Sequence, residues 1–456
     1  MVRVSSRLVD ITESLLPVLG PATELPEVAW SGPRTWWAGP LDVEGLAAAS
    51  VTLASAAATR LAERRGNPVL LGTTADLLAA NFGSLDHLRI DGRAPVGFAP
   101  LSGYFETADG WVRLHGNYPH HAAALGEALG VGDRDSLAVV LRDLSALDVE
   151  RRVRAAGGIA GALRRPAAWR TSEPARAVDA SPWIAVDLHP RQRPLPAASG
   201  SPLSGIRVLD LTRVIAGPTG SRLLALLGAD VLRVDPPQLP ELLDQHLDTG
   251  FGKRSAVADL RDPAVAARLH ELLDGADVLL TGYRPGALGG LGLDPASLAE
   301  RHPDVVHVSL SAWGETGPWG SERGFDSIVQ SVTGIGHVYG SSDGTGRFVP
   351  GALPVQALDH ATGYGMAAAA MAMLASGQAG TASLSLARTA HVLLDAGPLP
   401  GATAATLDVD LVTTPSTHGL LVHAPAPVTL DGVSIPQQAP GAYGRADLAW
   451  LTPSAS

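Results

Sequence analysis

The chain has 456 residues, 46% of them hydrophobic, which is enough for two or three packed domains with a sizeable core. The absence of cysteine excludes disulfides, thiolate catalysis and cysteine-ligated metal sites. The formal net charge is −11 and no basic stripe is interleaved with aromatic residues, so we expect no nucleic-acid partner.

The N-terminal segment 1–19 alternates charged and apolar residues and lacks the continuous hydrophobic core of a secretory signal. We therefore expect a cytoplasmic protein. Segment 366–374 is alanine-rich but too short to span a bilayer. It predicts a buried helix, and we expect no membrane partner.

Proline and glycine clusters at 31–40 and 190–202 mark the expected domain boundaries. A tail and linker over 1–40 precede a small α+β domain over 41–190. This domain opens with a helical pattern at 43–65. Two extended segments follow, 103–107 and 110–115, joined by a hairpin turn at 108–110. Further helical patterns lie at 120–129 and 136–155.

After a linker over 191–203, apolar runs alternate with helical stretches, which is typical of a parallel sheet with crossover helices. The expected strands are 208–211, 231–234, 278–281 and 305–310. We therefore predict an α/β fold, with a Rossmann-like domain over 204–395 in addition to the smaller α+β domain. Segment 396–456 is proline-rich with short extended runs such as 419–423. We expect it to pack on the other domains.

The turn after the first of these strands carries Gly217 and Pro218. Backbone N–H groups at such a turn and helix start favour anions, as in nucleotide-binding βαβ units. Asp235 stands near the position of a ribose-binding acid, although the full G-x-G-x-x-G fingerprint is absent. The pattern alone leaves two interpretations open, a nucleotide site and an ordinary crossover of an α/β sheet.

No metal site is expected, because the fourteen histidines are scattered and no H-E-x-x-H motif occurs. The G-x-S-x-G motif is also missing. Metalloenzyme and hydrolase interpretations are therefore poor.

Six segments stand in the order of one enzyme family's motifs. They are 202–218 (PLSGIRVLDLTRVIAGP), 227–235 (LGADVLRVD), 252–260 (GKRSAVADL), 276–286 (ADVLLTGYRPG), 311–318 (SAWGETGP) and 323–326 (RGFD). Together they resemble the class III CoA-transferases, a family that includes formyl-CoA transferase, carnitine CoA-transferase and α-methylacyl-CoA racemase. The resemblance implies coenzyme A, bound as an acyl-CoA, and a small carboxylic acid as partners.

Asp359, in the segment 357–363 (ALDHATG), matches the family's catalytic aspartate, so the resemblance assigns it as the nucleophile. A positioned, partly desolvated carboxylate can attack a thioester and then carry CoA as an aspartyl thioester. The residues alone allow another interpretation, in which Asp359 caps a helix that begins near Ala361. The two roles are compatible, because a helix N-terminus also stabilises an ionised carboxylate.

The resemblance also implies CoA contacts within the matched motifs. Candidates for the phosphates are Arg233, Lys253, Arg254, Arg284 and Arg323. Arg323 is favoured because a phosphate-contacting lysine of the family matches there. Tyr283 is a candidate for stacking on the adenine, with a core aromatic as the alternative. Val214, Ile215 and Gly282 complete the expected contacts. For each cation the alternative is a solvated surface charge.

Three positions of this chain differ from the family's pattern. The family usually has Asn at the position of Gly282, and formyl-CoA transferase has a glutamine that supports the reacting carbonyl at the position of Ile215. The acid/base histidine of the racemases matches Phe325, which cannot move a proton. His360 and His337 lie nearby in sequence as alternatives for that role.

Domain order departs as well, because the family's usual arrangement places the nucleotide domain first. Here 103–114 and 125–130 resemble the family's small domain and precede the matched motifs. We infer a rearranged or duplicated member, with a degraded first copy of the nucleotide half in 43–81. The family's interlocked homodimers predict a homodimer.

The first hypothesis is transfer of CoA from an acyl-CoA to a carboxylic acid through Asp359. One alternative is an acyl-CoA isomerase or racemase that uses Asp359 as a base, which Phe325 disfavours. Another is a catalytically inactive acyl-CoA-binding protein, consistent with Gly282 and Ile215. The glycine-rich segment 340–346 is predicted as an oxyanion-binding lid or as a surface hairpin.

Overall fold

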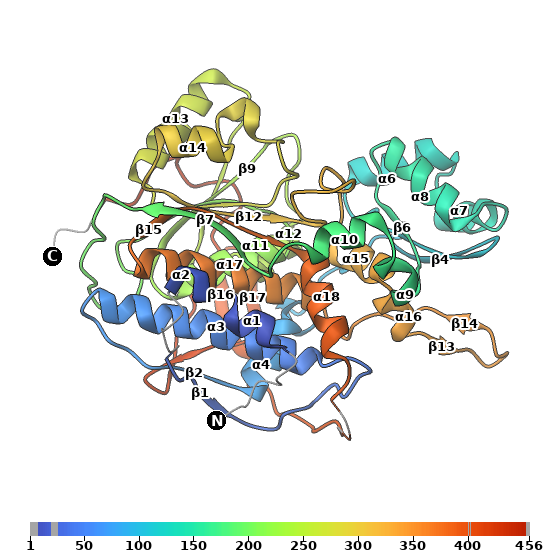
Figure 1. Cartoon of the computed structure of the whole chain (residues 1–456), viewed down its shortest axis with the longest axis horizontal. Helices are drawn as coiled ribbons and strands as arrows, with labels where there is room; N and C mark the ends of the chain where they lie inside the picture. Colours follow the sequence, from blue (N-terminus) through green and yellow to red (C-terminus); the bar gives the residue numbers. More distant parts are fainter. Residues whose placement is uncertain (1–7, 20–25, 400, 402, 453–456) are drawn as a thin grey trace.

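The structure is a computed structural model that describes residues 8–19, 26–399, 401 and 403–452. It has a mixed α/β fold around a seven-stranded sheet that crosses the middle of Figure 1. The strands are β7 (Ala185–Pro190), β8 (Arg207–Leu211), β9 (Asp230–Asp235), β10 (Arg254–Val257), β11 (Val278–Thr281), β12 (Val306–Ser311) and β15 (Gln378–Ser385). All neighbouring strands are parallel except β7, which runs antiparallel to β15 at one edge. The four strands expected from the apolar runs are confirmed.

The strand order is β10-β9-β8-β11-β12-β15-β7. The chain moves outward from β8 through β9 to β10 and then returns to the other side of β8 with β11. The direction of winding therefore reverses between β8 and β11. Ligands of doubly wound sheets bind beyond the carboxyl ends of the strands at such a reversal. The loops that follow Leu211 and Thr281 meet there.

Helices cover both faces of the sheet (Figure 1). Helices α11 (Ala216–Leu226) and α17 (Ala357–Ala375) lie on one face, and α13 (Pro263–Gly275) and α14 (Pro295–Arg301) lie on the other. Two separate apolar clusters fill the spaces between sheet and helices. This two-sided burial explains why the central strands are nearly continuous runs of Val and Leu.

Helix α17 is buried along its whole length, between α11 and the long helix α3 (Val43–Arg64). The alanine-rich faces of α3 and α17 let the two helices pack closely. By length and composition α3 is the helix in the described part of the chain that qualifies to cross a bilayer, but 89% of its most apolar window is buried inside the protein. It therefore packs as a core helix.

The N-terminal part surrounds α3. Its elements are α1 (Val9–Glu13), α2 (Leu16–Leu19), β1 (Ala29–Ser31), β2 (Leu71–Thr74), α4 (Ala75–Phe82), α5 (Ser84–His87) and β3 (Arg89–Ile90). Strands β1 and β2 are parallel and flank α3 in sequence, so this part contains its own βαβ unit.

A lobe projects from one side of the main sheet (Figure 1). It consists of the antiparallel strands β4 (Gly103–Thr107), β5 (Gly110–Leu114) and β6 (Ala160–Ala162), with helices α6 (Pro119–Leu129), α7 (Arg134–Leu141) and α8 (Ala146–Ala155). The expected hairpin is confirmed. The helical pattern 136–155 is split in two, because Ser145 accepts a hydrogen bond from the N–H of Asp148 and starts a new helix. The lobe has its own apolar core.

The remaining elements belong to the main body or lie between it and the lobe. They are α9 (Pro166–Arg170), α10 (Glu173–Asp179), α12 (Leu243–Thr249), the 3-10 helix η2 (Gly289–Leu291), α15 (Asp326–Thr333), α16 (Ile335–Val338), β13 (Ser341–Ser342), β14 (Phe348–Val349) and α18 (Leu386–Ala396). Region 41–190, expected as one domain, is distributed over three places. Helix α3 packs on α17, β4 to α8 form the lobe, and β7 joins the main sheet.

The C-terminal segment adds strands to the N-terminal part. Strand β17 (Gly419–His423) pairs with β3 on one side and with β16 (Val412–Ser416) on the other, and β18 (Thr429–Leu430) with β19 (Val433–Ser434) extends the sheet of β2. Further on, the Trp450 indole N–H donates to the carbonyl of Leu272 on α13. The segment thus contacts both the N-terminal part and the main sheet's helices.

Candidate active site

Asp359 lies in the first turn of α17 and is 6% exposed. The helix begins at Ala357, earlier than the expected start near Ala361. The prediction that Asp359 caps this helix is therefore wrong, because its own backbone is already helical. Gln356 occupies the N-cap position and its side chain makes no capping hydrogen bond.

The N-terminus of α17 is capped instead by a carboxylate from α15. Asp326, the first residue of α15, accepts a hydrogen bond from the N–H of Asp359 at 3.0 Å and another from the N–H of Leu358. The amide of Gln330 donates to the other oxygen of Asp326, and the Gln330 carbonyl accepts from the N–H of Leu353. This network fixes the position of the helix end that carries Asp359.

The cap brings two buried carboxyl groups together, which changes how both ionise. Burial raises the pKa of Asp326 to about 6. Burial and the nearby charge of Asp326 raise the pKa of Asp359 well above its usual value. A buried, weakly hydrated carboxylate is a better nucleophile than a solvated one, once it is ionised.

A cavity of about 420 Å³ opens next to Asp359. Its wall comes from the end of α4 and α5, the lobe and the loop before it, the loop after β8, α12, and the starts of α15 and α17. Aromatic and aliphatic side chains supply much of the lining, among them Phe82, Phe98 and Phe325. The cavity therefore has the mixed character of a small-ligand site, apolar with a few polar groups.

Two glycines set the distance between α11 and α17. A Cβ at Gly363 would collide with the carbonyl oxygen of Ala216, and one at Gly220 would collide with the carbonyl oxygen of Gly363. Their hydrogen side chains allow the two backbones to touch. The contact places the start of α11, and Ile215 before it, beside the first turns of α17.

Val214 and Ile215 both line the cavity, as expected for ligand contacts. Val214 has φ of +69°, a left-handed conformation that is unfavourable for a β-branched residue. Its N–H donates to Glu241 at 2.9 Å. Backbone strain of this kind is concentrated at functional sites.

Arg233 does not reach the cavity. It is 1% exposed, and its guanidinium lies 2.8 Å from Asp235 and 2.8 Å from Glu241. Asp235 is buried in the same cluster, so it does not stand free as a ribose acceptor. The structure places both residues in the core beneath the loop that follows β8.

Lys253 and Arg254 also lie away from Asp359, in a separate open hollow of about 1080 Å³ where strands β8 to β10 begin. Lys253 donates to Ser221 at 2.8 Å and lies 3.5 Å from Asp210. Burial lowers the pKa of Lys253 to about 8. Arg254 is paired with Asp230 at 2.7 Å.

Gly282, Tyr283 and Arg284 follow β11 at the reversal point. Tyr283 and Arg284 line a cavity of about 220 Å³ beyond the ends of β11 and β12. Arg323 is close enough to Arg284 for the second charge to lower its pKa, after the larger effect of burial. Within the described residues neither arginine has an ion-pair partner. Arg323 donates to the carbonyl of Gly157 at 2.8 Å.

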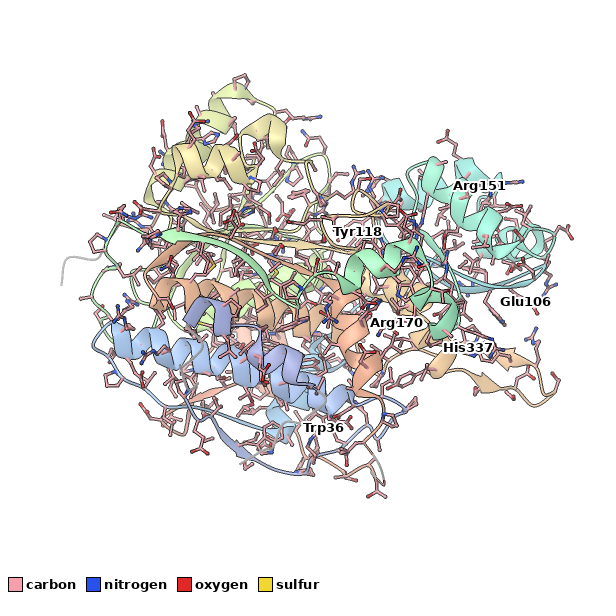
Figure 2. All side chains as sticks on the ribbon, viewed as in Figure 1. Trp36, Glu106, Tyr118, Arg151, Arg170 and His337 are labelled. Carbon is pink, nitrogen blue, oxygen red and sulfur yellow. The ribbon has the colours of Figure 1, made fainter. Side chains whose placement is uncertain are left out.

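Several residues of this region are missing from the candidates taken from the sequence. Arg213 follows β8 and lies 5.0 Å from the Tyr118 ring, which sits between the lobe and the sheet (Figure 2). Asp326 was in a matched motif without being singled out. Arg113 and His115, from the lobe hairpin, both line the cavity. Their spacing of two puts them on one face of an extended chain, which is the signal that could have found them.

Of the two histidines near Asp359 in sequence, His360 lines the cavity and His337 does not. His360 lies 3.2 Å from Thr219 and packs against Phe82, and burial lowers its pKa to about 3. The His337 ring lies 5.0 Å from Phe348 on the projecting hairpin (Figure 2). Segment 340–346 belongs to this hairpin and does not line the cavity. Among the residues described, no group of three or more His, Cys, Asp or Glu is arranged to hold a metal ion.

Comparisons with known proteins place the matched motifs in one family. Residues 203–403 match the model of CoA-transferase family III. A probable fatty acyl-CoA transferase of Mycobacterium tuberculosis is 35% identical over 186 residues, which cover 38% of this chain and 46% of the relative. A succinate–glutarate CoA-transferase of Agrobacterium fabrum is 36% identical over 161 residues, which cover 31% and 40%.

A crystal structure of a hypothetical protein from Mycobacterium tuberculosis is 34% identical, with 42% of this chain and 57% of that chain covered and a TM-score of 0.39. The chain thus spans less than half the length of these two curated relatives. Residues 203–403 therefore resemble CoA-transferase family III.

Proposed function

We propose that the protein transfers CoA from an acyl-CoA thioester to a carboxylic acid, with Asp359 as the covalent carrier. The observation that carries the proposal is the buried carboxyl group of Asp359 on the wall of a cavity beside the sheet's reversal point. The resemblance of residues 203–403 to CoA-transferase family III supports it.

In the first half-reaction a carboxylate oxygen of Asp359 attacks the thioester carbonyl carbon. The C–S bond breaks, CoA thiolate leaves, and an acyl–aspartyl anhydride remains. The thiolate then attacks the carbonyl carbon of Asp359, and the donor acid leaves as its carboxylate. Asp359 now holds CoA as a thioester.

The second half-reaction runs these steps in reverse with a new acid. The acceptor carboxylate attacks the aspartyl thioester and displaces the thiolate, which then attacks the acceptor's carbonyl carbon in the new anhydride. The product is the acceptor's CoA thioester, and Asp359 is regenerated as a carboxylate. No net redox change occurs and no water is consumed. The apolar cavity wall serves to keep water from both reactive intermediates.

For the nucleotide end of CoA we propose the Rossmann-like crevice beyond β8 and β11. Arg284 and Arg323 are cations without carboxylate partners in the described structure, whereas Arg213, which follows β8, lies 3.8 Å from Asp235. Phosphates would pair with Arg284 and Arg323. A Cβ built on Gly282 would make only ordinary van der Waals contact with Thr212. The space that the family's Asn side chain would fill is therefore open to the ligand.

This assignment predicts the effect of replacing either of the two arginines that lack a carboxylate partner. Arg284→Ala or Arg323→Ala should raise KM for an acyl-CoA about tenfold, because each removes a charge-assisted contact to phosphate. Steady-state kinetics at low salt measure the change. The acyl thioester of N-acetylcysteamine, which lacks the nucleotide, should be unaffected. An equal loss with both thioesters would contradict the assignment. Arg151→Ala, on the outer surface of the lobe (Figure 2), is the control.

One observation favours a second candidate function, acid/base exchange at the α-carbon of an acyl-CoA. The His115 ring stacks on Phe325 at 4.1 Å, and both of its ring nitrogens are buried without a hydrogen-bond partner. Burial lowers the pKa of His115 to about 3, which keeps the imidazole neutral. The lobe therefore supplies an imidazole beside the position where the racemases carry theirs. His115 and Asp359 line the same cavity, so an imidazole and a carboxyl group are both present there for proton transfer.

One experiment separates these functions from an inactive acyl-CoA binder. The protein is incubated in deuterated water with a panel of acyl-CoAs and free acids, and thioesters are followed by mass spectrometry. We expect CoA to move between acids, and an adduct of CoA mass to appear on the peptide that contains Asp359. Deuterium at the α-carbon without CoA exchange would favour the racemase. Binding with neither change would leave a binding protein and overturn the transferase.

By the family resemblance we also propose a cytoplasmic homodimer. Light scattering coupled to size-exclusion chromatography measures the assembly.

A further inference from the structure

Arg113 is a cation in the wall of the Asp359 cavity that has no anion of its own. Its guanidinium carbon lies 4.8 Å from the centre of the Phe98 ring and 5.2 Å from that of the Tyr104 ring. Its Nε is buried without a hydrogen-bond partner, and within the described part of the chain no ion pair includes it. The aromatic rings hold the plane of the guanidinium in place without occupying its N–H groups.

The charges on the cavity wall make this arginine unusual. Four carboxyl groups line the cavity, Asp86, Asp248, Asp326 and Asp359, whereas Arg113 is the lining residue with a permanent positive charge. A half-buried guanidinium left without an anion carries a desolvation cost that a bound carboxylate would offset. A planar guanidinium also matches the two oxygens of a carboxylate.

Arg113 and Asp359 line the same cavity but come from different parts of the fold. Arg113 is on β5 of the lobe, whereas Asp359 is in the first turn of α17. A molecule in this cavity can therefore present one group to Asp359 and another to Arg113. A single small molecule contacts both only if it carries functional groups at two ends.

We propose that Arg113 binds a second carboxylate of the acid whose other carboxyl group exchanges CoA at Asp359. The preferred acids are then α,ω-dicarboxylates, and the lobe hairpin supplies their specificity. This inference rests on the proposed function for the reacting end. The Arg113 site itself is a carboxylate-binding site with or without turnover.

The test measures binding and turnover separately. Isothermal titration measures the binding of four diacids, malonate, succinate, glutarate and adipate, and of two monoacids for comparison, butyrate and valerate. The proteins titrated are the wild type, Arg113→Met, Arg113→Lys and Arg151→Met. CoA exchange is followed with the same acids. We expect at least one diacid to bind much more tightly than the monoacids. Arg113→Met should weaken that binding about 30- to 100-fold, with monoacids changed little. Arg113→Lys should restore part of it, and Arg151→Met should match the wild type.

Equal binding of diacids and monoacids by the wild type would overturn the inference, and so would an equal loss of both in Arg113→Met. If CoA passes efficiently to monoacids without a preference for diacids, the transferase stands and the Arg113 site fails. If diacids bind in an Arg113-dependent way and no CoA moves, the Arg113 site stands and the transferase fails.

Discussion

Asp359→Asn should reduce CoA transfer by about 10³-fold or more, because the amide cannot form the anhydride and thioester intermediates. The same substitution should make the protein more stable at neutral pH. It replaces a buried carboxyl group, next to the carboxyl group of Asp326, with a neutral group of the same shape. The thermal unfolding midpoint and CoA exchange, measured on one preparation, check both effects.

The stability difference should depend on pH in a defined direction. In the unfolded chain an aspartate has a pKa of about 3.9, whereas the folded protein raises the pKa of Asp359 well above this value. The folded state therefore binds the proton more tightly, and the wild type loses stability as pH rises from the unfolded pKa through the folded one. The gain from Asp359→Asn should be small at pH 4 and larger at pH 7.

Two further variants test the cause of this effect. Asp326→Asn removes the neighbouring charge, so the alkaline rise in activity that accompanies ionisation of Asp359 should move to lower pH. The exposed Asp135→Asn should change neither activity nor the midpoint. A destabilised Asp359→Asn protein at neutral pH would show that the Asp326 and Asp359 pair is not strained by charge.

Gly363→Ala should destabilise the protein by about 3 kcal/mol, although alanine is intrinsically the better helix former. The added methyl group would collide with the carbonyl oxygen of Ala216, so α11 and α17 must move apart. Separation would also move Ile215 relative to Asp359, and kcat should fall even in the folded fraction. Chemical denaturation and kinetics at low temperature measure the two losses.

A second glycine serves as a control that separates the effect of close helix packing from that of intrinsic helix propensity. Gly290, in η2, has no atom within 4 Å of a built Cβ, so Gly290→Ala should leave stability within about 0.5 kcal/mol of the wild type. If Gly363→Ala proved as stable as Gly290→Ala, the close contact between α11 and α17 would not hold.

The main sheet was predictable because its strands are buried on both faces and appear as short apolar runs. The role of Asp359 as nucleophile was predicted from the family resemblance, and the structure places this residue in a cavity wall. The cations predicted to contact CoA lie in different environments. Arg284 and Arg323 stand in loops beyond the sheet, whereas Arg233 is held by Glu241, a partner supplied by a different loop. Which arginine is free depends on such tertiary pairing, and motif position alone does not reveal it.

Arg113 and Asp326 are two further residues whose place in the site depends on tertiary contacts that the sequence does not reveal. Arg113 lies in a hairpin of the lobe, far in sequence from Asp359, and the two share a cavity only because the lobe folds against the ends of α15 and α17. Asp326 caps a helix to which it does not belong. A cap of that kind has no local sequence signature, since its acceptor and its donors are separated by an intervening hairpin.

The lobe has an apolar core separate from the one around α17. Under the roles proposed for Arg113 and Asp359, acid selection and bond-making chemistry sit on two independently packed units of one polypeptide. Natural variation in the hairpin of β4 and β5 can retune which acids are accepted without disturbing the helix that carries the carboxyl nucleophile. Grafting that hairpin between related chains is a direct route to altered acceptor choice.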